Sequence, residues 1–231
     1  MGAVTKRVSK YKNAKEESAS RIVELKALTD NQATYLKALR FSNQVIVTGC
    51  AGTGKTYMAA THAANLYADN KIDKIVITRP IVPVGRDLGY FKGDLKEKYA
   101  PWAAPVMDVL VAQLGAGVVE SGLNHGNIEA APLATMRGRS FNNAFMLLDE
   151  AQNTTLQEFK MFLTRIGKNT SVVINGDLLQ SDLESGSGLS YIINMAKKYN
   201  MDIPVIEFGI EDIVRSDICK QWIIAFSKEK L

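Results

Sequence analysis

The segment Gly49–Thr56 reads GCAGTGKT and fits the pattern G-x-x-x-x-G-K-[ST] at every fixed position. An apolar, β-rich run precedes it and a helix-forming segment follows, which is the context that the pattern requires. The glycines let backbone N–H groups turn inward around phosphates, and the N-terminus of the following helix adds partial positive charge. We expect Lys55 to reach the β- and γ-phosphates of a nucleotide, and the Thr56 hydroxyl to bind Mg²⁺.

The whole loop is therefore predicted to bind the phosphates of ATP. Its members are Gly49, Cys50, Ala51, Gly52, Thr53, Gly54, Lys55 and Thr56. Cys50 is expected to act as a small spacer within the loop and not as a reactive thiol.

Two adjacent acids, Asp149 and Glu150, end the apolar run Phe145–Leu148. A carboxylate at the end of a strand that faces a phosphate loop can hold Mg²⁺ through its water shell, and we assign Asp149 this role. Glu150 is then placed to polarise the attacking water as a general base. The pair predicts hydrolysis and weighs against a phosphotransferase, in which water is not the nucleophile.

Two glutamines are further candidates. Gln180 follows Gly176-Asp177 at the end of another apolar run, and we predict that it senses the γ-phosphate or the attacking water, with Asp177 in support. A plain turn is the alternative at this position. Gln32 precedes the first core strand, and its amide can make two hydrogen bonds to the adenine edge. For Gln32 taken alone, a structural role is favoured over recognition of adenine.

The elements that must position these residues alternate between strand and helix patterns. We predict strands at Gln44–Thr48, Lys74–Thr78, Ala144–Leu148, Ser171–Asn175 and Pro204–Phe208, and one more near 128–134. We predict helices at 14–28, Asp30–Arg40, Lys55–Tyr67, 101–114, Thr155–Ile166, Gly188–Lys198 and Ser216–Ser227, with Asp30 as the cap of the second. This alternation predicts an α/β fold: a three-layer P-loop NTPase with a mostly parallel sheet covered on both faces.

Length and composition bound the class of protein. The chain has 231 residues, of which 46% are apolar and 23% charged, which makes one packed domain feasible and argues against global disorder. We expect residues 1–13 to form a basic, flexible tail and residues 14–231 a single ATPase domain. The net charge of +4 permits nucleic-acid binding without arguing for it.

Location follows from what the sequence lacks. No run approaches the roughly 18 uncharged apolar residues of a membrane-spanning helix, and the N-terminus has no apolar signal segment. The two cysteines, Cys50 and Cys219, are too few for a disulfide framework. A cytoplasmic protein with no membrane partner is therefore expected.

Taken in order, several segments resemble the PhoH-like family of ATPases, which is related to superfamily 1 helicases. The likeness runs from about Asp30 to Phe226. Besides the loop Gly49–Thr56, the segments that carry it are Asn31–Tyr35, Ile77–Pro80, Leu88–Tyr90, Gly93–Lys98, Ala131–Arg139, Leu148–Thr155, Met161–Gly167, Gly176-Asp177 with Gln180, and Asp212–Arg215. The resemblance implies a RecA-like core that binds and hydrolyses ATP, and a link to RNA metabolism, with RNA unwinding in some members. Some larger relatives carry a PIN nuclease domain; too few residues precede Asp30 for one, so no nuclease activity is expected.

A single RecA-like lobe raises the question of what completes the site. An arginine that approaches the γ-phosphate is worth roughly 10³–10⁵ in rate, so we expect a neighbouring subunit to supply it in a closed ring. The resemblance points to a homohexamer. Arg215 is the first candidate for this arginine because it lies in a late arginine block like that of helicases, and Arg165 and Arg79 are the alternatives.

The expected partner is nucleic acid, single-stranded RNA before DNA. Basic residues that could line a channel for its backbone are Arg79, Lys92, Lys96, Lys98, Arg137 and Arg139, and Tyr90 and Phe91 beside them could stack on bases. Ordinary core or lid packing is the alternative for the two aromatic residues. The predicted function is Mg²⁺-dependent ATP hydrolysis coupled to binding, translocation or unwinding of nucleic acid. The alternative is an ATP-gated binding switch without helicase activity.

Overall fold

Six parallel strands form one sheet within the part of the chain that the structure describes. The computed structural model describes residues 24–81, 95–178, 180 and 187–229. The strands are β1 (Gln44–Gly49), β2 (Lys74–Thr78), β3 (Ile128–Ala130), β4 (Ala144–Leu148), β5 (Ser171–Gly176) and β6 (Val205–Phe208), in the order β3-β2-β4-β5-β1-β6. One strand, β5, therefore separates β1, which precedes the phosphate loop, from β4, which ends in the acid pair.

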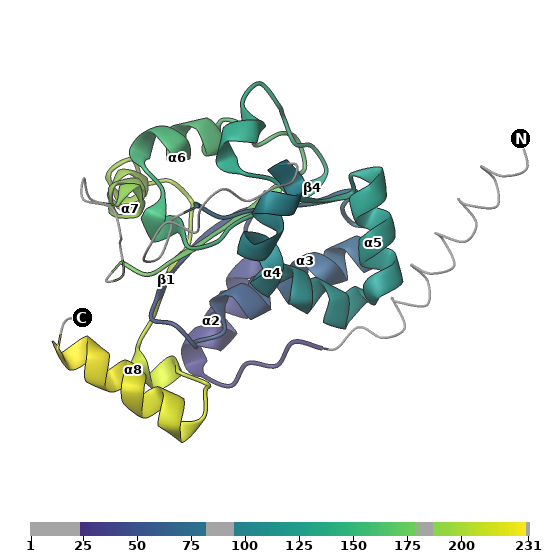
Figure 1. Cartoon of the computed structure of the whole chain (residues 1–231). Helices are drawn as coiled ribbons and strands as arrows, with labels where there is room; N and C mark the ends of the chain where they lie inside the picture. Colours follow the sequence, from purple (N-terminus) through teal and green to yellow (C-terminus); the bar gives the residue numbers. More distant parts are fainter. Residues whose placement is uncertain (1–23, 82–94, 179, 181–186, 230–231) are drawn as a thin grey trace, which may run out of the picture.

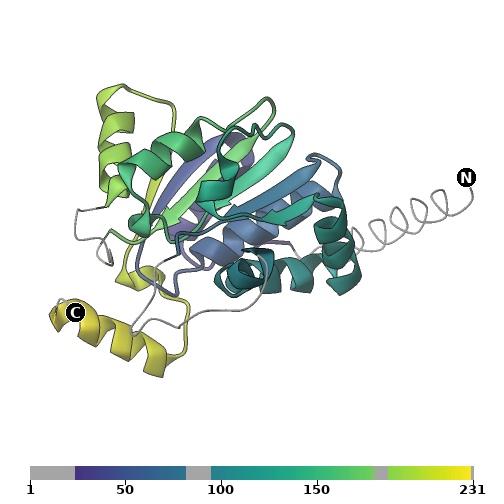
Figure 2. The same cartoon turned by 45° about the horizontal axis from the view of Figure 1, so that its top comes forward.

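Helices cover both faces of the sheet. The helices are α2 (Asp30–Phe41), α3 (Lys55–Ala68), α4 (Leu95–Leu114), α5 (Ala116–His125), α6 (Leu156–Leu163), α7 (Gly188–Lys198) and α8 (Asp217–Glu229), with short 3₁₀ turns at Leu133–Met136, Ala151–Asn153 and Ile210–Asp212. Helices α2 to α5 lie on one face, and α6 and α7 lie on the other (Figures 1 and 2). Helix α8 stands apart from both layers beside the carboxyl-terminal end of the sheet (Figures 1 and 2).

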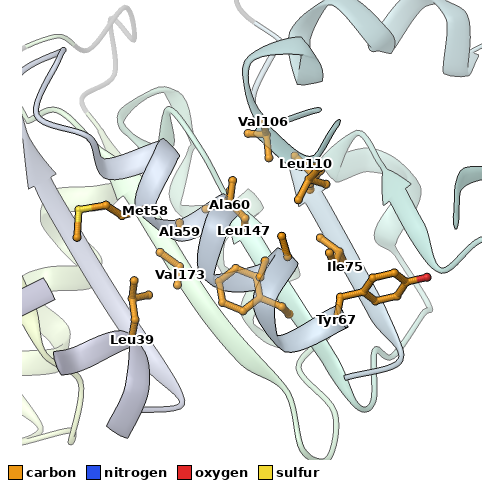
Figure 3. Close-up of a cluster of buried hydrophobic side chains, with 14 of the residues drawn as sticks. Leu39, Met58, Ala59, Ala60, Tyr67, Ile75, Val106, Leu110, Leu147 and Val173 are labelled. Atoms are coloured by element: carbon orange, nitrogen blue, oxygen red, sulfur yellow. The ribbon is translucent and has the colours of Figure 1, made fainter. Parts of the chain in front are cut away.

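The alternation of side chains along each strand builds two cores. In β1, Val45 and Val47 join the core under α2 to α5, while Ile46 joins the core under α6 and α7. Figure 3 shows the first core, in which Tyr67 and Leu110 pack from helices against side chains of the central strands. Since successive side chains of a strand point to opposite faces, a sheet buried on both faces reads as a continuous apolar run. The predicted three-layer α/β fold is confirmed.

Two predicted elements and one predicted helix cap need correction. Residues 24–28 of the predicted helix 14–28 are not helical, and its earlier part lies outside the described residues. The cap of α2 is Thr29 and not Asp30: the Thr29 hydroxyl accepts a hydrogen bond from the backbone N–H of Gln32 over 3.2 Å. The strand predicted near 128–134 ends at Ala130, because Pro132 follows and a 3₁₀ turn begins at Leu133.

The segment between β2 and β4 is more helical than its prolines suggest. Helix α4 begins before the predicted residue 101 and contains both Pro101 and Pro105. Helix α5 was not predicted; it begins after Gly115, whose φ of +84° turns the chain. No single helix in the described ranges has the length and apolarity to cross a membrane, and α4 and α5 meet that test only together, across a 120° bend. Both helices contribute to the first core.

Candidate functional site

The phosphate loop lies between β1 and α3, at the carboxyl ends of the parallel strands. Its glycines adopt conformations that other residues rarely take: φ is +134° at Gly49, +82° at Gly52 and +90° at Gly54. A Cβ atom on Gly49 would also lie 2.4 Å from the carbonyl oxygen of Phe208. The loop therefore needs glycine for both its turn and its close contact with β6.

Lys55 begins α3 and turns its side chain back over the loop. Its Nζ donates hydrogen bonds to the carbonyl oxygens of Gly49 (2.5 Å) and Cys50 (2.8 Å). Burial lowers the pKa of Lys55, and the nearby carboxylate of Asp177 opposes that shift. The ammonium group is thus held at the mouth of the loop, where an anionic ligand would replace its two carbonyl partners.

The side chains of Thr56 and Asp149 are hydrogen-bonded to each other at the carboxyl ends of the strands. The Thr56 hydroxyl donates to Oδ1 of Asp149 over 2.8 Å, and the side-chain amide of Asn175 donates to the same oxygen over 3.4 Å. Asp149 is only 3% exposed, and burial raises the pKa of its carboxyl group, against the effect of the Thr56 hydrogen bond. A hydroxyl and a carboxylate are the hard oxygen donors that Mg²⁺ prefers, so this pair fits the ion.

Sequence reasoning missed Asn175. It is the penultimate residue of β5, the strand between β1 and β4, and its Oδ1 accepts a hydrogen bond from the buried Tyr35 hydroxyl over 3.3 Å. The feature of the sequence that could have identified Asn175 is a polar side chain at the carboxyl end of a strand. A chain of hydrogen bonds thus links α2 through Asn175 to Asp149.

Glu150 follows β4 with a left-handed φ of +52°. Its Oε1 accepts from Nη2 of Arg79 over 3.1 Å, and its Oε2 accepts from Nε2 of Gln152 over 2.7 Å. Gln152 in turn accepts a hydrogen bond from the backbone N–H of Asp177 over 3.0 Å. The adjacency of β2 and β4 brings Arg79 to Glu150, a contact that the sequence does not show.

These groups share one cavity of about 650 Å³. The predicted site residues that line it are Gln32, Ala51, Gly52, Gly54, Lys55, Thr56, Asp149, Glu150, Gln180 and Arg215. Apolar residues line it as well, among them Leu25, Leu28, Met58, Pro105 and Val109. A cavity of this size with apolar walls and a few convergent polar groups suits a small-molecule ligand.

The two glutamines differ in their surroundings. Gln32 is buried; its Nε2 donates to the Thr53 carbonyl over 3.0 Å, and its Oε1 accepts from the Leu28 N–H over 2.8 Å. The amide supports the phosphate loop, and its second hydrogen and second lone pair are what a base edge would use. Gln180 is exposed at the cavity rim, where its backbone N–H donates to the Asp177 carbonyl. Both roles stay predictions.

Arg215 lies on the phosphate loop of its own chain. A Cβ atom on Gly52 would lie 2.7 Å from Cγ of Arg215, and the Val214 N–H donates to the Gly52 carbonyl over 3.0 Å. Arg165 does not line the cavity; its guanidinium donates to the carbonyls of Met161 and Arg139. The structure therefore places two of the three candidate arginines, Arg79 and Arg215, in their own site.

Of the residues predicted to line a basic channel, the structure describes the side chains of Arg79, Arg137 and Arg139. Arg139 makes a bidentate pair with Glu129, at 2.6 and 2.7 Å, and this pair lowers the pKa of Glu129. Its guanidinium also lies over the Phe141 ring, so Arg139 is engaged structurally. Arg137 is exposed. Tyr90, Phe91 and Lys92, and the side chains of Lys96 and Lys98, lie outside what the structure describes.

The surroundings of Cys50 are compatible with the predicted role as a spacer, which stays a prediction. Its Sγ lies 3.8 Å from the carbonyl oxygen of Gly209, and burial raises the pKa of its thiol. A raised pKa disfavours the reactive thiolate form.

Comparison with known proteins identifies the family. The family model described as PhoH-like protein matches residues 24–227. The chain is 44% identical over 205 residues to protein PhoH of Escherichia coli (strain K12), covering 87% of this chain and 58% of that protein. It is 42% identical over 220 residues to the PhoH-like protein of Bacillus subtilis (strain 168), covering 94% of this chain and 67% of that protein.

Among solved structures, the Pif1 helicase from Candida albicans matches with a TM-score of 0.48 and 15% identity, over 89% of this chain and 44% of that chain. The chain spans little more than half the length of the E. coli relative. Because the family model covers most of the chain, the expected resemblance is confirmed, and this chain belongs to the PhoH-like family.

Proposed function

We propose that this chain binds ATP with Mg²⁺ and hydrolyses it, and that hydrolysis is coupled to a nucleic acid, single-stranded RNA before DNA. The observation that carries the proposal is the 2.8 Å contact between Thr56 and Asp149 in the cavity that also contains Lys55 and Glu150. Phosphate-loop NTPases need these four roles together: a lysine for the phosphates, two oxygen donors for the ion and a residue for the water.

Each residue then has a defined task. The loop N–H groups and Lys55 bind the β- and γ-phosphates, and Thr56 and Asp149 would hold Mg²⁺, which neutralises charge on the phosphates when bound. Glu150 orients the attacking water and takes its proton as the new phosphorus–oxygen bond forms and the bond from the γ-phosphorus to the bridging oxygen breaks, which releases ADP. Gln180 at the rim contacts the γ-phosphate or this water. Arg215, which lies against the phosphate loop of its own chain, stabilises the developing charge in that site, or in the site of a neighbouring subunit as the sequence predicted.

The adenine is expected at the apolar part of the cavity. Leu25, Leu28, Pro105 and Val109 supply walls for a flat base, and Gln32 supplies polar groups beside them. Gln32 would form hydrogen bonds to the edge of the base while its Nε2 keeps the hydrogen bond to the Thr53 carbonyl.

Coupling to nucleic acid rests on the resemblance to helicase-related ATPases and on the exposed Arg137. Assembly into a ring, with six copies as the expected number, is supported by α8. On this helix Ile218, Trp222 and Phe226 follow one another at four-residue spacing and are 72%, 62% and 51% exposed. Side chains at this spacing share one helix face, and an apolar face of this kind fits a second copy of the chain. A cytoplasmic location belongs to the same proposal.

The test is steady-state ATP hydrolysis with and without single-stranded RNA and DNA. Glu150→Gln should bind ATP and lose hydrolysis by about 10²–10⁴-fold, the range that a general base contributes. Glu120→Gln, which changes an exposed acid on α5, should match the wild type. Hydrolysis that survives in Glu150→Gln would refute this assignment of the base.

A second assay, of strand displacement, distinguishes a nucleic-acid motor from an ATP-gated binding switch. ATP-dependent displacement of a paired strand would support a motor, whereas binding that follows the nucleotide state without displacement would support a switch. Hydrolysis that is indifferent to both polymers would remove the nucleic-acid part of the proposal and leave the ATPase.

A further inference from the structure

Both carboxylate oxygens of the proposed base are engaged by the chain itself. Arg79 binds Oε1 of Glu150 at 3.1 Å, and Gln152 binds Oε2 at 2.7 Å. A general base needs an oxygen directed at the proton that it takes. In the arrangement seen here the carboxylate is instead directed at a guanidinium and an amide.

The two partners of Glu150 are not equivalent. Gln152 is 2% exposed and also bonds to the backbone N–H of Asp177, so it is a fixed partner. The side chains of Arg79 and Glu150 are 24% and 40% exposed, and both line the ligand cavity. Solvent-exposed ion pairs contribute little to stability and therefore exchange readily.

The backbone of Arg79 is anchored while its side chain is not. The Tyr99 hydroxyl donates to the Arg79 carbonyl over 2.9 Å and accepts from the Arg79 N–H. Glu150 is likewise held in place, since its φ of +52° is one that the surrounding structure must impose. The guanidinium can thus leave Glu150 without moving either backbone.

We propose that Arg79 restrains Glu150 in the resting site, and that a phosphate group which takes the guanidinium releases Glu150 to act on water. Arginine binds phosphate in the same bidentate manner as carboxylate, so a phosphate is a direct competitor for Arg79. This inference rests on the proposed ATPase function. The phosphate belongs either to ATP, as its γ-phosphate, or to the backbone of single-stranded RNA.

The experiment compares Arg79→Gln with the wild type and with Arg40→Gln, a matched loss of an exposed arginine at the end of α2. Without nucleic acid, Arg79→Gln should hydrolyse ATP severalfold faster than the wild type. Its affinity for a fluorescent ATP analogue should be unchanged if an RNA phosphate takes the guanidinium, and weaker if the γ-phosphate does. Arg79→Lys retains a single-point cation and should fall between the two. Thermal melting of all variants checks that they fold.

The response to RNA identifies the source of the phosphate. If RNA stimulates the wild type and no longer stimulates Arg79→Gln, the RNA backbone releases Glu150. If Arg79→Gln is faster than the wild type and RNA stimulates both by the same factor, the γ-phosphate of ATP releases it.

The remaining outcomes overturn the inference. A basal rate in Arg79→Gln that is equal to the wild type would make the ion pair purely structural, and a lower rate would make Arg79 a direct aid to hydrolysis. Either result leaves the proposed ATPase intact, because the wild type is active in both. Absence of hydrolysis from the wild type and from Arg79→Gln would refute the ATPase and the restraint together.

Discussion

Arg215 lies over Gly52 of the same chain, so that a Cβ atom on Gly52 would lie 2.7 Å from Cγ of Arg215. The hydrogen bond from the Val214 N–H to the Gly52 carbonyl holds the two segments together. Arg215 is also two residues before the start of α8. The phosphate loop is thus in direct contact with the segment that leads into the exposed C-terminal helix.

We predict that Gly52→Ala weakens ATP binding by at least tenfold. Alanine is strained at the φ of +82° found at Gly52, and its methyl group would displace Arg215 from the loop. Isothermal titration with a non-hydrolysable ATP analogue measures the loss.

The control for this variant is Gly117→Ala in α5, where a Cβ atom would meet nothing within 4 Å. That variant should keep its affinity and gain about 0.5–1 kcal/mol of stability, since alanine is the better helix former. Wild-type affinity in Gly52→Ala would show that the loop and Arg215 tolerate a side chain.

Asp149→Asn should stabilise the metal-free protein while it removes Mg²⁺-dependent hydrolysis. Burial raises the pKa of Asp149, so the folded state holds its proton more tightly than the unfolded state does. The stability from this group is present below the unfolded pKa and is lost as pH rises through the folded pKa. At neutral pH the buried carboxylate therefore destabilises the folded state. Its replacement by an amide in Asp149→Asn should raise the free energy of unfolding by about 1 kcal/mol.

Chemical denaturation at pH 7 without Mg²⁺ measures the stability, and a Mg²⁺ titration of hydrolysis measures the function. Thr56→Ala provides the comparison: it should also impair hydrolysis but should not stabilise the protein, because the buried charge remains. A metal-free Asp149→Asn protein that is less stable than the wild type would contradict the role of burial.

His62 makes the fold sensitive to mild acid. Its pKa is lowered to about 4 by burial on α3 and by the nearby Arg40. Because the folded pKa is below the unfolded value of about 6.5, the stability from neutral His62 is present above pH 6.5 and is lost as pH falls toward 4. We expect a loss of roughly 1–3 kcal/mol over this range.

The measurement is urea denaturation at several pH values between 7 and 4.5. His62→Gln should show a smaller fall in stability than the wild type, and the difference isolates His62 from the carboxyl groups that titrate in the same range. Parallel curves for the two proteins would mean that His62 ionises freely in the folded state.

The face of α8 formed by Ile218, Trp222 and Phe226 should mediate self-association. The rings of Trp222 and Phe226 stack at 5.8 Å, which presents one continuous aromatic surface. Trp222→Ser should shift the protein to smaller species in analytical ultracentrifugation, most clearly with ATP and Mg²⁺ present. Tyr199→Ser, at an exposed tyrosine after α7, should not change the distribution. An unchanged distribution in Trp222→Ser would exclude this face as the contact.

Most of the scaffold could be predicted from the chain alone. The strands β1, β2, β4 and β5 are short apolar runs that are nearly continuous, as strands buried on both faces must be, and the edge strand β6 contains the exposed Glu207. Between β2 and β4, the sequence predicted a helix at 101–114 and a strand near 128–134, but neither the earlier start of α4 nor helix α5 was predicted. Packing against the sheet outweighs the local cost of Pro101 and Pro105.

The candidate site likewise has one part that the sequence predicts and another part that only the fold determines. Gly49–Thr56 and the pair Asp149-Glu150 are local patterns, so their residue types and spacing alone predict the phosphate loop and the acids at a strand end. The contacts between Arg79 and Glu150, Asn175 and Asp149, and Arg215 and Gly52 join residues far apart in the sequence. The strand order β2-β4-β5-β1-β6 decides the first two of these contacts. Strand order depends on how two cores pack around a common sheet, which no local spacing of residues encodes.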